Sequence, residues 1–394
     1  MVVSGAALVA GALALVAGVA YLVRRWRLLA GLGTALVLGG LARAVGMASG
    51  VPHMDLADLL LWPGSGLRTG VTVGMDLPLA LGTHTWSLAA VEASWLECWL
   101  LVGAGAALLA LASSEERLPA LVALALLGGV GWAAAGSPAS GLWGGAVLLC
   151  AVAVMLGGGE PSLLFLASGA VGLVAMLLAS GESAPSLASG AAVLSLAFWF
   201  GCPPWGPWAS RACRSAEPAA AGFALAFLPA LGWGLLRPAM ALAEPTWLLG
   251  GAVWLLAVGG LGALIHRDPR QVWHDSALIN LGLTLLVAAR AGFGWEGVRW
   301  ALAWRSAAMA ALAWGFSGLS EASEAGEGRR PWATVAVLGG LAALVGLPPL
   351  PAFGLWRDVL ALGGEAAFPA WAAVAAGAWG AGALGWWRVL KGLA

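Results

Sequence analysis

The stretch FWFGCPPWGPWASRACRSAEPAAAGFALAFLPALGWGLLR, Phe198–Arg237, joins two apolar segments through a connection rich in proline, tryptophan and arginine. Proline has no backbone N–H to donate and disfavours helix in the residue before it. Pro203 and Pro204 are therefore expected to break the segment that starts near Ser186. Apolar sequence resumes at Ala219. The stretch predicts a broken helix followed by a second apolar helix.

The composition around this stretch is that of a membrane protein. The chain has 394 residues, of which 61% are hydrophobic and 10% charged, and its mean hydropathy is +0.90. Soluble domains carry about 25% charged residues. The net charge of zero gives no basic surface for nucleic acid. The four cysteines have no metal-ligand spacing, so we expect neither a metal nor a cofactor: Cys98, Cys150, Cys202 and Cys213.

Thirteen segments are apolar and close to the length of about 20 residues that crosses a hydrocarbon core. Long continuous runs in lipid are helical, because a helix satisfies its own backbone. We therefore predict an all-α polytopic membrane protein whose first span is retained rather than cleaved. The expected spans are roughly 4–23, 27–46, 85–112, 118–136, 140–157, 161–181, 186–203, 219–237, 246–265, 275–292, 298–318, 331–360 and 367–388.

The basic residues of the loops predict the orientation, because cytoplasmic loops carry an excess of arginine and lysine. Three lie on one side: Arg68, Arg237 and Arg290. Twelve lie on the other: Arg24, Arg25, Arg27, Arg117, Arg211, Arg214, Arg267, Arg270, Arg329, Arg330, Arg388 and Lys391. This bias places the N-terminus outside and the C-terminus in the cytoplasm, in an integral protein of a bacterial inner membrane. A small extracytoplasmic hairpin is expected in the long connection Ala48–Thr83.

Two further stretches share the order and spacing of a known family: IHRDPRQVWHDSALINLGL (Ile265–Leu283) and LVGLPPLPAFGLWRD (Leu344–Asp358). With Phe198–Arg237, they resemble the antiporter-like membrane subunits of complex I, of membrane-bound hydrogenases and of Mrp-type cation/proton antiporters. The resemblance implies one transmembrane domain, 1–394, built from N-terminal helices with a hairpin (4–116) and two inverted five-helix repeats (118–237 and 246–388). It also implies other membrane subunits as partners within the lipid bilayer, and a second helix break at Pro348 and Pro349.

The positions of the family's buried lysines carry other residues here. The resemblance places them at Trp199, at Pro229 (or Ala230 if the register slips by one) and at Trp356. A buried lysine can release its proton and so relay protons across the midplane, whereas tryptophan and proline cannot titrate. Arginine is no substitute, because its pKa is too high. The usual proton path is therefore expected to be closed or rebuilt.

A few ionisable residues remain at membrane depth, and each is a candidate for an ion path. They are Glu92, Glu97, Arg305, Arg357 and Asp358, with Arg299 at the edge of a span. The local sequence after Glu92 resembles the family's fifth span, while helix counting makes it the third. The alternative role for both glutamates is an interhelical or arginine-pairing contact.

Three hypotheses about function follow from these residues. The first is an antiporter-like subunit of a complex-I-like assembly, of the NADH-quinone oxidoreductase or hydrogenase type, that acts as a scaffold or degenerate proton channel. The second is an active translocator with a path rebuilt from Glu92, Glu97, Arg305 and Arg357. The third is a stand-alone substrate transporter. The sequence offers no catalytic constellation, so any oxidoreductase activity would belong to the whole complex.

Overall fold

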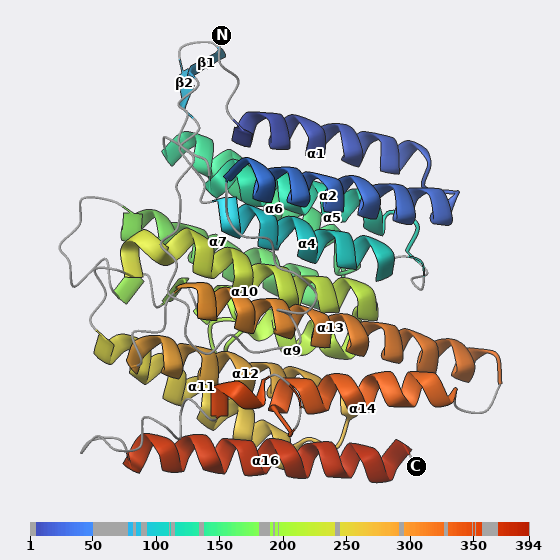
Figure 1. Cartoon of the computed structure of the whole chain (residues 1–394), viewed down its shortest axis with the longest axis vertical. Coiled ribbons are helices and arrows are strands. Elements are labelled where there is room, and N and C mark those ends of the chain that lie inside the picture. The colour runs from blue at the N-terminus through green and yellow to red at the C-terminus, as the bar shows by residue number, and fades with distance from the viewer. Residues whose placement is uncertain are drawn as a thin grey trace.

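The computed structural model describes residues 5–49, 78–81, 84–87, 93–109, 111, 115–133, 138–180, 190–191, 194–195, 197–240, 245–290, 295–326, 330–348, 350, 352–356 and 369–393. Most of these residues are helical (Figure 1). In chain order the helices are α1 (Gly5–Leu22), α2 (Arg27–Ser49), α4 (Ala93–Leu109), α5 (Leu118–Ala133), α6 (Pro138–Met155), α7 (Glu160–Ser180), α9 (Pro207–Ser215), α10 (Pro218–Met240), α11 (Pro245–Ile265), α12 (Pro269–Arg290), α13 (Trp295–Glu324), α14 (Pro331–Val345) and α16 (Pro369–Leu393).

These helices match most of the predicted spans, with informative differences at their starts. In the span expected at 85–112, the helix is α4, which starts at Ala93. The first residues of that span instead belong to β2 (His84–Ser87), which forms an antiparallel hairpin with β1 (Pro78–Leu81). The hairpin expected in the preceding connection is thus seen at its C-terminal end, and residues 50–77 lie outside the described residues. The span expected at 275–292 begins earlier, at Pro269, since proline is favoured at the first helical position.

The connection quoted first contains a helix that the sequence reading did not predict. Helix α9, Pro207–Ser215, follows the proline pair, and Pro207 occupies its first turn. Its apolar and polar residues alternate with a strong helical periodicity, and Trp208, Ala209, Ala212 and Cys213 are buried. The chain between the break and α10 therefore packs as a short amphipathic helix rather than as a loop.

Three of the described helices are long and apolar enough to cross a membrane: Arg27–Val45, Trp247–Ile265 and Pro269–Ala289. Several shorter apolar helices accompany them, among them Leu118–Ala133 and Pro218–Gly234. Figure 1 shows the helices lying roughly parallel in one stack, from α1 and α2 at one end to α16 at the other. Of the three long spans, the one in α12 is the most buried. Within it, 89% of the residues are buried, compared with 33% in α2 and 39% in α11. Helix α12 is therefore central to the second half of the chain.

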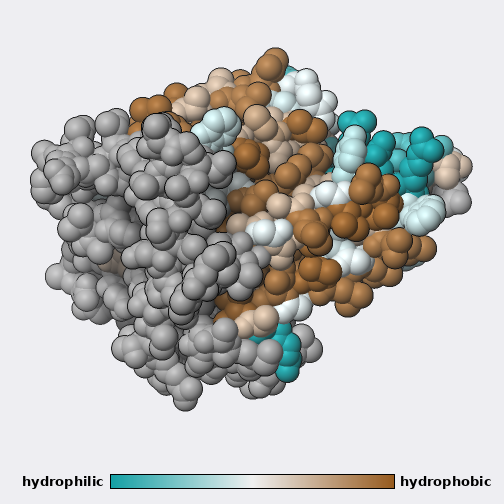
Figure 2. All heavy atoms as spheres, turned by 90° about the horizontal axis from the view of Figure 1, so that it is seen from above, coloured by the Kyte–Doolittle hydropathy of each residue, from teal (hydrophilic) through white to brown (hydrophobic). Residues whose placement is uncertain are grey.

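Arginines gather where several helices end on the same side of the stack, and we call this side the arginine-rich end. Arg270 of α12 donates to the carbonyl oxygen of Arg214 (3.4 Å) and to Ser320 Oγ of α13 (3.1 Å). Arg388 of α16 donates to the carbonyl oxygen of Leu264 (2.8 Å) at the end of α11. Figure 2, which views the stack from above, shows hydrophilic residues gathered mainly at one end beside a largely hydrophobic surface.

Candidate functional site

The first helix break is closed by side chains from neighbouring segments. Helical residues end at Trp199, a turn carries Pro203 and Pro204, and α9 begins at Pro207. A proline removes the backbone donor for the carbonyl four residues earlier, so carbonyl groups around such a turn need other partners. The carbonyl oxygen of Pro203 accepts a hydrogen bond of 2.7 Å from Nε1 of Trp254, on α11. The break is thus joined to the second half of the chain.

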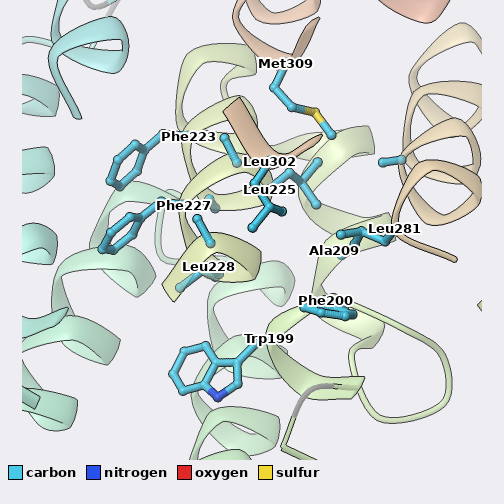
Figure 3. Packing of buried hydrophobic residues seen from close by; sticks show 14 of the residues in the cluster. Trp199, Phe200, Ala209, Phe223, Leu225, Phe227, Leu228, Leu281, Leu302 and Met309 are labelled. Carbon is cyan, nitrogen blue, oxygen red and sulfur yellow. The ribbon is translucent and has the colours of Figure 1, made fainter. Parts of the chain in front are cut away.

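Trp199, which the sequence resemblance predicts to stand at a lysine position of the family, is fully buried, at 0% exposure. Its Nε1 donates to Ser195 Oγ (3.0 Å), which donates in turn to the carbonyl oxygen of Gly172 (3.1 Å). The ring of Trp132 meets it edge-on with centroids 5.9 Å apart. Figure 3 shows Trp199 in the apolar core with residues of α10 such as Phe227. This position is filled by a packed aromatic ring.

Pro229 and Arg305, two candidate residues from different helices, are brought together by one carbonyl group. Pro229 lies within α10 and cannot donate to the carbonyl oxygen of Leu225 four residues earlier. Arg305 of α13 supplies the missing donors, with Nε and Nη2 lying 3.3 and 3.2 Å from that oxygen. Pro229 therefore leaves a carbonyl oxygen without its helical donor, and the buried guanidinium of Arg305 donates to it.

The same guanidinium also binds α12. Nη1 of Arg305 donates to the carbonyl oxygen of Ala277 at 2.6 Å, and Arg305 is 1% exposed. Arginine carries its donors in a planar fork, so one side chain can bridge two backbones rigidly. The contacts of Arg305 fix α10, α12 and α13 to one another. They describe a structural cross-link better than a mobile proton carrier.

The second helix break lies at the end of α14. Gly346 caps the helix in the left-handed conformation (φ 75°), which glycine adopts without strain. Pro348 follows and removes the donor for the carbonyl of Leu344. Asn280 of α12 supplies it instead, through an Nδ2 contact of 3.3 Å. This break is therefore also closed by a side chain of a neighbouring helix.

Trp356, predicted by the resemblance to stand at the third lysine position, also contributes to the second break. Its Nε1 donates to the carbonyl oxygen of Val345 at 3.0 Å, and its ring meets that of Trp379 with centroids 6.1 Å apart. Trp379 itself donates to the carbonyl oxygen of Gly346 at 3.4 Å. The two indole N–H groups thus donate to backbone carbonyl groups at the C-terminal end of α14. Trp356 and Trp199 belong to one apolar core but have different ring partners, Trp379 and Trp132.

Several candidates fall outside what the structure describes. They are Glu92, Pro349, Arg357 and Asp358. Glu97 lies in α4 and Arg299 in α13, with their side chains outside the described part. Of the described candidates, the structure brings together Pro229 and Arg305, at the carbonyl group of Leu225.

A cluster of titratable residues that the sequence reading missed lies between α11 and α12. The carboxylate of Asp275 is 2% exposed and lies 2.7 Å from Nδ1 of His266 and 3.5 Å from Nδ1 of His274. The signal was Pro269, which marks a helix start and so places both residues of the pair His274 and Asp275 inside the span. A buried ionisable group in a span is a functional candidate.

The sequence matches no protein-family model and no curated protein. The fold does match solved structures. A chain of the Mrp complex from Dietzia sp. has a TM-score of 0.76 at 18% identity, covering 99% of this chain and 80% of that one. A chain of the membrane-bound sulfane sulfur reductase, an archaeal respiratory membrane complex, has a TM-score of 0.71 at 16% identity, covering 98% and 87%.

A chain of respiratory complex I from Thermus thermophilus has a TM-score of 0.67 at 15% identity and covers 98% of this chain and 89% of that chain. All three structures are complexes by their descriptions, and the sulfane sulfur reductase is described as a respiratory membrane complex. The resemblance drawn from the three sequence motifs is thereby confirmed at the level of the fold. With its apolar helices, the chain is an integral membrane protein with the fold expected of antiporter-like subunits.

Proposed function

We propose that this chain is an antiporter-like subunit of a complex-I-like membrane assembly and acts there as a scaffold, with the family's lysine relay closed. The observation that carries the proposal is what occupies the lysine positions. Trp199 packs in the core, Pro229 creates an acceptor for Arg305, and Trp356 caps the end of α14. Each position contributes to packing or to backbone hydrogen bonding, and neither tryptophan nor proline can carry a proton.

The rebuilt translocation path is less well supported. Arg305, its central member, is held by the carbonyl oxygens of Leu225 and Ala277, and a guanidinium does not release its proton at working pH. Glu92, Arg357 and Asp358 lie outside the described residues. The path therefore lacks a described group that could take up and release protons at the position of Arg305.

The stand-alone transporter is favoured by one observation, a cavity of about 780 Å³ beside the first break. Its described lining is apolar or aromatic, including Pro203, Trp205, Trp247 and Trp254. Such a lining suits a hydrocarbon chain better than an ion or a polar solute. The three similar structures are all complexes, and this favours partners that are other membrane subunits, as proposed above.

The scaffold proposal is tested by ion flux per electron transferred in intact complexes. Glu92→Gln and Glu97→Gln should leave this ratio nearly unchanged, because no lysine relay remains for either group to feed. Glu321→Gln is the control, since Glu321 is exposed and pairs with Arg330 (2.8 Å) at the arginine-rich end. A tenfold loss of flux at unchanged electron transfer in either variant, with the control normal, would overturn the proposal.

The proposed placement in the membrane follows from the loop arginines. Reporter fusions after Arg27, Arg214, Arg270 and Arg330 should all report the cytoplasm, with the N-terminus outside, in a bacterial inner membrane. The same fusions test the thirteen spans and the division into repeats at 118–237 and 246–388. Two or more reporters on the opposite side would contradict both.

A further inference from the structure

The cluster of His266, Asp275 and His274 runs from the surface into the interior. The His266 side chain is 39% exposed, whereas those of Asp275 and His274 are 4% and 5% exposed. His274 continues the series, because its Nε2 lies 3.4 Å from the carbonyl oxygen of Gly201, in the first helix break. The three side chains therefore connect the arginine-rich end with the broken helix.

The neighbouring helix leaves room for this carboxylate. A Cβ atom added at Gly262 of α11 would lie 2.6 Å from Cγ and 2.9 Å from Oδ2 of Asp275, which is too close for any side chain. Any residue other than glycine at this position would therefore force the Asp275 carboxylate to shift. The Asp275 carboxylate occupies the space that a side chain at position 262 would fill.

The hydrogen-bond partners define where protons reside in the cluster. With its amide oriented to satisfy both neighbours, Gln271 donates to Nε2 of His266 (3.3 Å) and accepts from Nε of Arg214 (3.1 Å). His266 then accepts at Nε2 and donates from Nδ1 to Asp275, which is the pattern of a neutral imidazole. With His266 neutral in this arrangement, His274 is the ring considered next as the binding site for a further proton.

Both ring nitrogens of His274 face acceptors. Nδ1 faces Oδ1 of Asp275 at 3.5 Å, and Nε2 faces the carbonyl oxygen of Gly201 at 3.4 Å. A neutral imidazole has a single N–H and can satisfy one of these acceptors, whereas an imidazolium donates to both. The protonated ring also neutralises the buried carboxylate, whose burial without a counter-ion would be costly.

The other charged and titratable groups around the cluster come from α9, α11–α12, α13 and α16. They are Cys213, Arg214, Arg267, Asp268, Arg270, Arg305 and Arg388. Arg270, Arg305 and Arg388 donate to backbone carbonyl oxygens. Among the described side chains, the two histidines are the basic groups within 4.0 Å of the Asp275 carboxylate. His266 donates a hydrogen bond to it, and a protonated His274 would compensate its charge.

We propose that His266, Asp275 and His274 form a proton-binding site, open at the arginine-rich end, whose bound proton clamps α12 onto the helix break at Gly201. A proton enters at Nε2 of His266, and the Nδ1 proton of that ring passes to Asp275. The carboxyl group then protonates Nδ1 of a His274 that carries its single N–H at Nε2, which leaves a carboxylate and an imidazolium. The neighbouring rings of Trp199 and Phe200 are buried and cannot titrate, so the relay proposed here ends at Gly201.

This inference goes beyond the scaffold proposal, because a scaffold needs no proton site. It is tested on the full-length chain in lipid nanodiscs with ¹⁵N-labelled histidine. The chain has four histidines, so signals can be assigned with His266→Gln and His274→Gln. We expect His274 to be doubly protonated at neutral pH in the wild type and to become a neutral ring in Asp275→Asn. His84→Gln, in the hairpin, is the control and should leave the His274 signal unchanged.

A second measurement covers the case in which Asp275→Asn fails to fold. His274→Gln keeps an amide N–H for Gly201 but cannot titrate, so proton uptake between about pH 5 and 8 should fall by about one proton per chain relative to the wild type. A neutral His274 in the wild type, or unchanged uptake in His274→Gln, would overturn the proton site.

The ion-flux ratio separates this outcome from the scaffold proposal. If the His274 signal responds to Asp275→Asn and the flux per electron stays unchanged, both proposals stand. If the flux falls tenfold while the His274 signal responds, the proton site stands and the scaffold fails. If His274 is neutral and the flux is unchanged, the scaffold stands and the proton site fails.

Discussion

The helix breaks after Trp199 and after Val345 both pack against α12, and each receives a side chain from it. His274 reaches the carbonyl of Gly201 in the first break, and Asn280 reaches the carbonyl of Leu344 in the second. The two α12 residues are about 9 Å apart along the helix axis, at 1.5 Å per residue. One helix therefore helps to close two breaks in two halves of the chain.

The difference between the breaks is the kind of group that closes them. Indole groups donate at both breaks, but the first also receives a histidine that belongs to a carboxylate cluster, whereas the second receives an amide. Both arrangements supply hydrogen-bond donors to carbonyl groups that lack them. The fold thus needs donors at the breaks, and it does not need those donors to titrate. Under the scaffold proposal, this would explain how the chain keeps the fold with tryptophan and proline at the expected lysine positions.

The largest effect is expected where one side chain serves several helices. Arg305→Met leaves the carbonyl of Leu225 without a donor, and an unsatisfied buried acceptor costs about 1–3 kcal/mol. Pro229→Ala restores a backbone N–H four residues after Leu225, so the double variant should recover much of this loss. The measurement is the free energy of unfolding of each variant in mixed detergent micelles.

Ser306→Ala is the matched control for Arg305, because Ser306 is the next residue and its hydroxyl donates within α13, to the carbonyl oxygen of Leu302 (2.8 Å). It should change the stability by less than about 1 kcal/mol. An equal cost of Arg305→Met with and without Pro229 would show that the two residues do not share the carbonyl of Leu225, and that the break-closing scheme is incorrect there.

A smaller effect is expected at the second break. Trp356→Phe keeps an aromatic ring but removes the N–H that binds the carbonyl of Val345, and should destabilise the chain by about 1–2 kcal/mol. Trp314→Phe is the control, since Trp314 is exposed and its ring lies against Trp332. Thermal unfolding followed by size-exclusion chromatography would rank the two variants. If Trp356→Phe and Trp314→Phe are equally stable, the N–H of Trp356 does not contribute to closing this break.

The fold was predictable because its determinants are local. Long apolar segments, arginines in the loops and the proline pairs could all be read from the sequence, and most expected spans coincide with helices. Partners of the freed carbonyls could not be read in this way. Leu225 and Arg305 are 80 residues apart, and their contact depends on how α10 and α13 pack. The sequence indicated Pro229 and Arg305 separately and gave no sign that they share an acceptor.

The titratable cluster was missed for a different reason. Placing the start of the span at 275 left His274 in a loop, where a charged pair is unremarkable, whereas helix α12 begins at Pro269. The initial proline was a usable signal for this earlier start. The role of Gly262 could not be inferred, because its closeness to Asp275 arises from the packing of α11 on α12.

The smallest effect, and the one that separates the two breaks, is expected from Gly262→Ala. The added methyl group would displace the Asp275 carboxylate and so weaken the His274 contact at the first break, while leaving the Asn280 contact at the second break in place. We expect a loss of about 1 kcal/mol, because overpacking typically costs 1–3 kcal/mol and an alanine in a helix recovers about 0.5–1 kcal/mol relative to glycine. Unfolding in mixed micelles measures the change.

Gly250→Ala is the matched control on the same helix, because a Cβ added there has no neighbour within 4 Å among the described residues. It should leave the stability unchanged or raise it by about 0.5–1 kcal/mol. The ¹⁵N signal of His274 then decides between local and global effects. A changed signal in Gly262→Ala with an unchanged signal in Gly250→Ala places the damage at the carboxylate. If both variants behave alike, the space beside Asp275 has no special role and the first break is closed independently of it.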